Sequence, residues 1–142
     1  MPIEVFTDDW ARACCENLNR RGTLRASAAG WDAPVVLVME ADAALGVETE
    51  RACWFELRKG ECRAARAATE ADLGEAPYVL RAGPAAWRRI LEGETDPVAA
   101  VMQGKLRLAR GNLMALARYA PVARELVAAA AEAGGAFPPP RL

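Results

Sequence analysis

The sequence predicts one α+β domain in which about five strands form a mostly antiparallel sheet with helices packed on one face. Segments with strand character and segments with helical periodicity both occur, and the strands are joined by a tight turn as well as by helical connections, which is typical of this class. The length of 142 residues is enough for a single sizeable core. An apolar content of 53% with 26% charged residues is that of an ordinary soluble protein.

The first helix is predicted from its capping signals. Thr7 is a suitable N-cap, and Asp8 and Asp9 in the first turn favour the positive end of the helix dipole. The helix then runs to about Arg20 and ends at Gly22. Residues 23–33 are expected to form a short helical turn that carries Leu24 and Trp31 toward the core.

Three strands follow in the first half of the chain. Residues 34–39 are short, apolar and rich in valine, and residues 49–58 and 61–67 are joined by the tight turn Lys59-Gly60. In a two-residue hairpin Leu57 faces Cys62. Strict alternation then places Phe55 and Leu57 on one face together with Arg66, and Trp54 on the other face.

The second half alternates strands with short helices. Residues 78–82 form a strand, and helices begin at Pro84 and at Asp96-Pro97 and end at Gly93 and Gly104. Residues 105–110 alternate basic and apolar side chains and are predicted as a strand. Two helices separated at Pro121 complete a domain over residues 1–134, and residues 135–142 form a flexible, proline-rich tail.

The composition excludes several classes of function. The net charge is −1 with basic and acidic residues interspersed, which argues against a nucleic-acid partner. There is no His, and Ser27 is the only serine, so a Ser-His-Asp catalytic triad is impossible. We therefore expect no catalytic residue, no metal site and no cofactor.

The four cysteines, Cys14, Cys15, Cys53 and Cys62, lack the CxxC spacing of metal and redox motifs. We expect them to be buried free thiols, with a metal site or a redox role as the alternatives. The apolar runs are too short to cross a bilayer, and the N-terminus has no basic region followed by an apolar one. The expected location is the cytosol.

The region between residues 78 and 112 resembles the core of the sterol carrier protein type 2 family. The shared pattern is a strand, a Trp-bearing helix ended by Gly, an Asp-Pro helix ended by Gly, and a Gly-Lys-Leu-x-Leu strand before the C-terminal helices. An N-terminal Trp, a Trp before the first strand and a Gly-x-Cys hairpin are similar to those of small stand-alone bacterial members. These features correspond to Tyr78-Val-Leu-Arg-Ala82, Trp87, Ile90-Leu91, Gly93, Asp96-Pro97, Ala99, Met102, Gly104 to Leu108, Gly111-Asn112, Trp10, Leu18-Asn19, Trp31 and Gly60-x-Cys62.

The resemblance implies a five-stranded sheet with helices that enclose a hydrophobic tunnel, and a protein that binds and transfers lipid without catalysis. The implied ligands are fatty acids, acyl-CoA, phospholipids or sterol-like molecules. A peroxisomal targeting signal needs a small residue at the position of Pro140, so the resemblance does not extend to peroxisomal targeting. The expected tunnel mouth includes Arg66, which alternatively turns outward to the sheet edge. The expected tunnel wall consists of Phe55, Leu57, Leu80, Met102, Leu106, Leu108, Leu113, Leu116, Val122 and Leu126.

The helices after Gly111 are expected to act as a lid that opens about Pro121, because their apolar stripes consist largely of alanine. Transient contact with a membrane surface fits this scheme, and a monomer and a homodimer both remain open. One alternative is an interaction module that pairs through Trp54 on the outer sheet face. The other is an enzyme that uses Cys14 or Cys15 as a thiolate.

Overall fold

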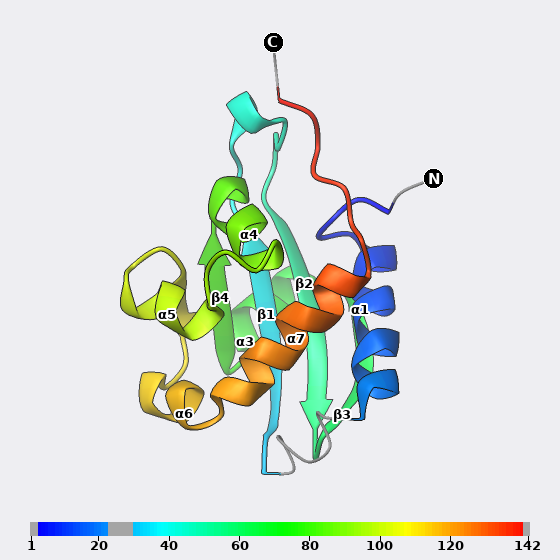
Figure 1. Cartoon of the computed structure of the whole chain (residues 1–142), viewed down its shortest axis with the longest axis vertical. Helices are drawn as coiled ribbons and strands as arrows, with labels where there is room; N and C mark the ends of the chain where they lie inside the picture. The colour runs from blue at the N-terminus through cyan, green and yellow to red at the C-terminus, as the bar shows by residue number, and fades with distance from the viewer. Residues whose placement is uncertain (1–2, 23–29, 141–142) are drawn as a thin grey trace.

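The strands of the sheet come from both halves of the chain. The computed structural model describes residues 3–22 and 30–140, in which five strands form one sheet in the order β3-β2-β1-β4-β5. Figure 1 labels the first four strands in chain order. β1 and β4 run parallel, and the other neighbours run antiparallel. This mixed, mostly antiparallel sheet confirms the predicted fold class. The strands are β1 (Asp32–Met39), β2 (Arg51–Arg58), β3 (Glu61–Ala67), β4 (Tyr78–Ala82) and β5 (Arg107–Arg110).

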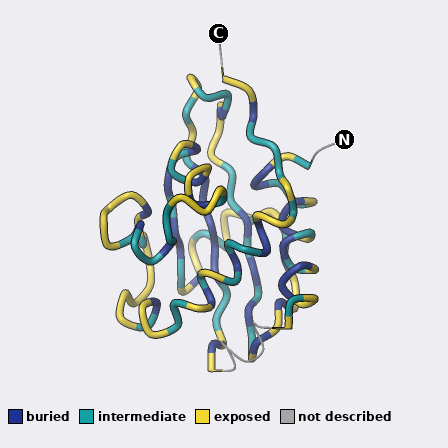
Figure 2. The backbone as a smooth tube through the Cα atoms, in the orientation of Figure 1, coloured by how far each residue is buried: buried dark blue, intermediate teal, exposed yellow. Residues whose placement is uncertain are grey.

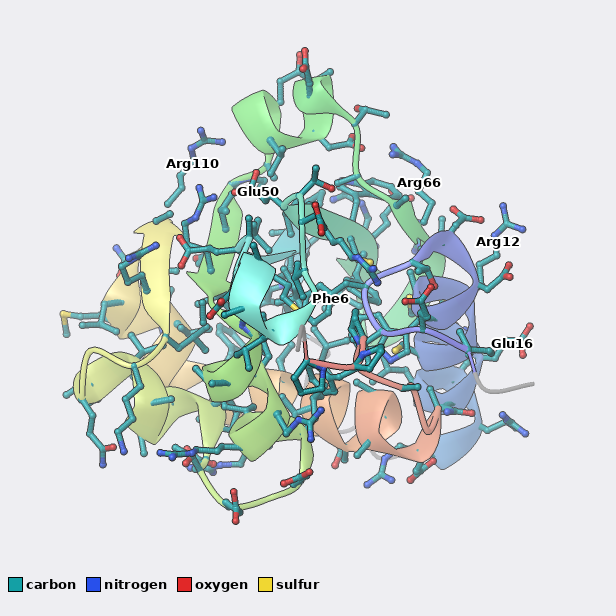
Figure 3. All side chains as sticks on the ribbon, turned by 90° about the horizontal axis from the view of Figure 1, so that it is seen from above. Phe6, Arg12, Glu16, Glu50, Arg66 and Arg110 are labelled. Atoms are coloured by element: carbon teal, nitrogen blue, oxygen red, sulfur yellow. A yellow bond between two sulfur atoms is a disulfide. The ribbon has the colours of Figure 1, made fainter. Side chains whose placement is uncertain are left out.

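Most helices cover one face of this sheet. In Figure 1, α7 crosses in front of β1 and β2, with α1 beside it and α4, α5 and α6 on the same side. Seen from above in Figure 3, α3 lies on the opposite side of the sheet. The helices are α1 (Asp8–Arg21), α3 (Glu70–Glu75), α4 (Pro84–Leu91), α5 (Pro97–Met102), α6 (Leu113–Arg118) and α7 (Ala120–Glu132), with a 3-10 turn η1 (Ala43–Leu45).

The first helix forms for the reasons expected from its ends. The Thr7 hydroxyl accepts a hydrogen bond from the backbone N–H of Trp10, and Gly22 ends the helix in the left-handed conformation at φ +73°. Trp10, Cys14 and Leu18 form its buried stripe. The predicted turn over residues 23–33 falls mostly on residues 23–29, which lie outside the described residues, as Leu24 does.

The central strand β1 is buried on both faces. Val35, Leu37 and Met39 join the main core under the helices, whereas Val36 and Val38 join a second apolar cluster on the other face. Ala76, Val79 and the half-buried Leu73 of α3 complete that second cluster. Figure 2 shows the resulting concentration of buried positions in the middle of the sheet.

The helix α3 was not expected from the sequence. The Thr69 side chain accepts from the backbone N–H of Asp72, and the Asp72 carboxylate accepts from the backbone N–H of Thr69. This reciprocal capping box is readable as Thr-x-x-Asp, but the short helix lacks the apolar periodicity that normally identifies one.

A β-bulge in the β2–β3 hairpin corrects the predicted facing of Arg66. Leu57 pairs with Cys62 as expected, but the register shifts next to this pair, so that Trp54 faces Arg66. One extra residue, Arg63, enters β3 and reverses the alternation beyond it. Ala65 therefore turns into the core, and Arg66 turns to the outer face beside α3 (Figure 3).

The proline-rich C-terminal segment runs beside the N-terminal one. Ala136 donates to the Ile3 carbonyl at 2.7 Å and accepts from the Val5 N–H at 3.0 Å. Phe137 lies under the guanidinium of Arg88 at 4.9 Å. The flexibility of residues 135–142 stays a prediction, and residues 141–142 lie outside the described residues.

Candidate functional site

The space between the sheet and the helices is filled by one apolar cluster, which includes most of the residues predicted to form a tunnel wall. Two of the assigned residues are instead exposed, Met102 at 69% and Leu113 at 42%. Leu108 is half-buried and packs against the core. The remaining seven are buried in one cluster: Phe55, Leu57, Leu80, Leu106, Leu116, Val122 and Leu126.

Two apolar cavities lie beside this core, where α4 meets α5 and α7. The first, of about 280 Å³, lies between α4, α5 and Lys105, and Arg89 and Lys105 bring two cations to it. Its other lining residues are Ala85, Ala86, Ile90, Thr95 and Ala100. The second, of about 310 Å³, lies between the α4–α5 connection and α7, and its lining includes Leu91, Val127, Ala128 and Ala131.

The two cavities adjoin. Ile90 and Thr95 line both of them, so the end of α4 and the α4–α5 connection form the partition. Each volume is close to the lower end of the range of about 300–1,000 Å³ for ligand pockets. Each cavity alone is therefore near the smallest size of a ligand pocket.

None of the predicted wall residues lines either cavity. The lining residues escaped the sequence analysis because alanines and an isoleucine in a helix resemble plain core packing. The readable signal was the small side chains of Ala85, Ala86 and Ala100 on two short neighbouring helices, since small residues leave space where two elements meet.

A third cavity, of about 180 Å³, continues from the second past Leu91 and Ala131 toward Trp10 and Phe137. The indole N–H of Trp10 is buried here and, within the described residues, has no hydrogen-bond partner. A buried donor without a partner costs roughly 1–3 kcal/mol.

The predicted lid is only partly free to move. The side-chain amide of Asn17 in α1 donates to the Ala129 carbonyl of α7 at 3.1 Å in a buried position. Arg21 forms ion pairs with Glu125 and Glu132 of the same helix, and Arg124 forms one with Asp96 at 2.6 Å. α7 is therefore held by α1 and by Asp96, the last residue of the α4–α5 connection.

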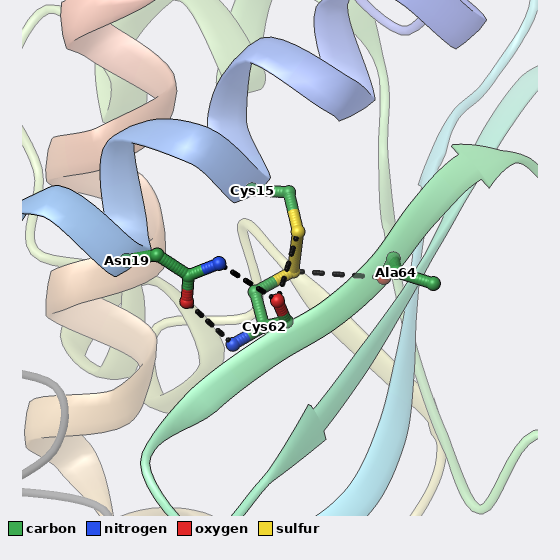
Figure 4. The surroundings of a disulfide bond; sticks show 4 residues. All are labelled: Cys15, Asn19, Cys62 and Ala64. Atoms are coloured by element: carbon green, nitrogen blue, oxygen red, sulfur yellow. Dashed lines mark hydrogen bonds between the residues drawn. A yellow bond between two sulfur atoms is a disulfide. The ribbon is translucent and has the colours of Figure 1, made fainter.

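Two of the four cysteines are bonded, which corrects the expectation of four free thiols. Cys15 of α1 and Cys62 of β3 form a disulfide with a Cα–Cα distance of 5.4 Å (Figure 4). The side chain of Asn19 donates to the Cys62 carbonyl and accepts from its N–H, both at 2.9 Å. α1 is thereby attached to β3, which is an edge strand of the sheet.

Cys14 and Cys53 are free and buried. Burial raises the pKa of the Cys53 thiol to about 12. Burial, with a smaller contribution from Cys53, raises the pKa of the Cys14 thiol further. Both side chains are protonated near neutral pH, so neither provides the thiolate that an enzymatic role needs.

The outer sheet face differs from the exposed surface that an interaction module needs. Trp54 is half-buried, and the guanidinium of Arg66 lies over its ring at 4.2 Å. Arg66 is ion-paired with Asp72 of α3, and its hydrogen bond lowers the pKa of that carboxyl. Arg66 therefore lies away from the two cavities and serves as a cover for the second apolar cluster.

Among residues 3–22 and 30–140, no three His, Cys, Asp or Glu side chains gather in a way that could hold a metal ion. In the same part of the chain, no helix is both long and apolar enough to cross a membrane.

Comparisons with known proteins agree with this architecture. The family model described as the SCP-2 sterol transfer family matches residues 18–124. A crystal structure of sterol carrier protein 2 is similar at 39% identity and a TM-score of 0.82, covering 91% of this chain and 98% of that chain. A solution structure of the conserved hypothetical protein TT1886 from Thermus thermophilus is similar at 38% identity and a TM-score of 0.83, covering 94% and 92%.

A more distant likeness concerns the fold alone. The apo form of sterol carrier protein 2 from Yarrowia lipolytica is 18% identical with a TM-score of 0.57, covering 84% of this chain and 87% of that chain. A search of the curated proteins finds no match.

Proposed function

The chain belongs to the SCP-2 sterol transfer family, a non-enzymatic lipid-binding family, and on that basis we propose that it binds one lipid between α4, α5 and α7. The proposed ligands are fatty acids, acyl-CoA, phospholipids or sterol-like molecules. The observation that carries the proposal is the pair of adjoining apolar cavities that share Ile90 and Thr95.

The chemistry of the first cavity favours an anionic amphipathic ligand. Its walls are mostly alanine and isoleucine, which suits an acyl chain, because each CH₂ removed from water gains about 0.8 kcal/mol. Arg89 and Lys105 supply positive charge for a carboxylate or a phosphate. We propose that the chain extends from there into the second cavity when the α4–α5 connection moves.

The core residues Phe55, Leu57, Leu80, Leu106, Leu116, Val122 and Leu126 lie next in the path of a longer chain. We propose that they become a tunnel wall when the helices separate from the sheet. The half-buried Leu108 and the exposed Met102 and Leu113 belong to the rim of such a tunnel rather than to its wall.

Transfer between membranes follows from the energetics of such a site. An acyl chain leaves water with a large gain, but it moves between a bilayer and an apolar cavity with little net change in free energy. A protein of this kind therefore loads and unloads without a large free-energy step. We propose transient membrane contact during both events, in a bacterial cytoplasm.

The test is a titration with a fluorescent fatty acid against a variant that fills the first cavity. Ala86→Leu places three additional carbon atoms in the cavity, and Ala13→Leu is the control, since Ala13 is a half-buried helical alanine away from both cavities. We expect Ala86→Leu to weaken binding about tenfold, equivalent to about 1.4 kcal/mol, and Ala13→Leu to bind as the parent protein does. Equal affinity of all three proteins contradicts the placement of the ligand.

A further inference from the structure

Two short helices at one side of the molecule expose large apolar side chains. Within the described residues, the exposed large hydrophobic side chains are Met114 at 82%, Met102 at 69% and Leu113 at 42%. Met102 ends α5, and Leu113 and Met114 begin α6, with β5 connecting the two helices. In Figure 1, α5 and α6 lie at the same side of the molecule.

The same segment carries an excess of positive charge. Between Asp96 and Glu125 the chain holds five basic residues and no acidic one, whereas the whole chain has a net charge of −1. Arg107 is ion-paired with Glu40, and Arg124 with Asp96. Lys105 and Arg118 are exposed and, within the described residues, have no carboxylate partner. A nearly neutral protein thus presents unpaired cations beside its exposed apolar side chains.

Several other surface arginines are already engaged. Arg20 donates to Asn17, Arg21 is paired with two carboxylates, and Arg88 lies over the ring of Phe137. Lys105 and Arg118 are therefore better suited to an external anionic partner than these three arginines are.

We propose that Met102, Leu113 and Met114, together with Lys105 and Arg118, form a docking surface for an anionic lipid bilayer. The apolar side chains enter the interfacial region, and the two cations contact the headgroups. Met114 and Arg118 are one helical turn apart on α6, so they lie on the same face and can reach the bilayer together.

The position of Lys105 connects this surface to the candidate site. Lys105 lines the first cavity as well as belonging to the docking surface. A bilayer in contact with the surface therefore lies at one end of that cavity, and a ligand can pass between them without crossing bulk water. This connection rests on the lipid-binding function proposed above, whereas the docking itself is measurable without it.

The combination of cations and exposed apolar side chains on one surface favours a bilayer over a second copy of this chain. A second copy brings the same cations to the interface, and like charges that face each other oppose association. An anionic bilayer supplies both complements, because it has negative headgroups above an apolar interior.

The experiment is flotation of the full chain with vesicles of equal parts phosphatidylcholine and phosphatidylglycerol, and with vesicles of phosphatidylcholine alone. The test variant combines Met114→Gln with Arg118→Glu, because both replacements are good helix formers and neither residue lines the cavities. The control is Arg63→Glu, which makes the same change in net charge at an exposed position of β3.

We expect binding to the anionic vesicles, with weaker binding to phosphatidylcholine and at high salt. The test variant should bind about 25-fold more weakly, about fivefold from the lost cation and about fivefold from the lost apolar contact. Arg63→Glu should bind as the parent protein does.

Three results overturn the proposal: no binding of the parent protein to anionic vesicles, equal binding of parent and test variant, or an equal loss in Arg63→Glu. A dimer in light scattering that the test variant abolishes also overturns it, because a second copy then covers the surface. Fatty-acid titration of the test variant without vesicles should match the parent, so a failed docking surface is distinguishable from a failed lipid site.

Discussion

Reduction of the Cys15–Cys62 disulfide should lower the thermal stability of the protein measurably. The bond closes a loop with a sequence separation of 47 residues. For a loop of that length the chain-entropy relation gives at most about 4 kcal/mol at 25 °C. With an unfolding entropy of about 2.1 cal/mol/K per residue, this corresponds to at most about 13 °C in Tm. We expect a decrease of about 5 to 13 °C, because measured disulfide contributions often fall below the value from the chain-entropy relation.

The assay is a thermal melt with and without a phosphine reductant. The matched control is the double variant Cys15→Ser with Cys62→Ser, which should melt at a lower temperature than the parent and should not respond to the reductant. A thiol count on the unfolded, unreduced parent protein should give two free thiols, from Cys14 and Cys53. Four free thiols, or a parent Tm that the reductant leaves unchanged, refute the reasoning.

Three further predictions concern individual side chains. Cys14 and Cys53 should resist iodoacetamide at pH 8 in the folded protein, since burial raises both pKa values; rapid native-state labelling contradicts this. Trp87→Phe should cost about 3 kcal/mol in urea unfolding, because its indole N–H donates to the buried Val38 carbonyl at 2.8 Å; a cost below about 1 kcal/mol contradicts it. The hydrogen bond from Arg124 lowers the pKa of Asp96 below its ordinary value of 3.8. The ionised Asp96 therefore stabilises the folded protein above that pH, and this stabilisation is lost on acidification. Asp96→Asn should therefore reduce the loss of stability between pH 5 and pH 3 relative to the parent, and an unchanged loss refutes this.

The sequence predicts the fold where local signals and burial agree. The first helix begins at Thr7 and ends at Gly22 in the structure as in the prediction, because capping residues act locally. The strand over residues 78–82 matches to the residue. The strand predicted from Pro34 begins instead at Asp32, and the one predicted from residue 49 begins at Arg51, since pairing in the sheet decides strand ends.

The register of the β2–β3 hairpin could not be predicted from the local sequence alone. A two-residue turn fixes the first pairs, and Leu57 does face Cys62, but an extra residue in β3 changes the facing of every later side chain. Because of that single bulge, Arg66 covers Trp54 on the outer face and does not approach the candidate site. The Cys15–Cys62 bond is likewise a tertiary contact between a helix and a strand, which spacing alone does not indicate.

The predicted wall residues and the two cavities lie at different places in the structure. The residues expected to form a tunnel wall are apolar and mostly buried, but packing places them in a filled core. The open space lies where short side chains of α4 and α5 meet, and such space depends on how two helices approach each other. Lys105 was assigned only to a strand with one wet face, whereas the structure brings it to a cavity.

The most direct test of lipid binding is native mass spectrometry of the protein purified without added lipid, followed by organic extraction of the same sample. We expect a mass increment equal to one fatty acid, acyl-CoA or phospholipid per chain, with the same molecule in the extract. A bare polypeptide mass that stays unchanged after incubation with a fluorescent fatty acid contradicts the account.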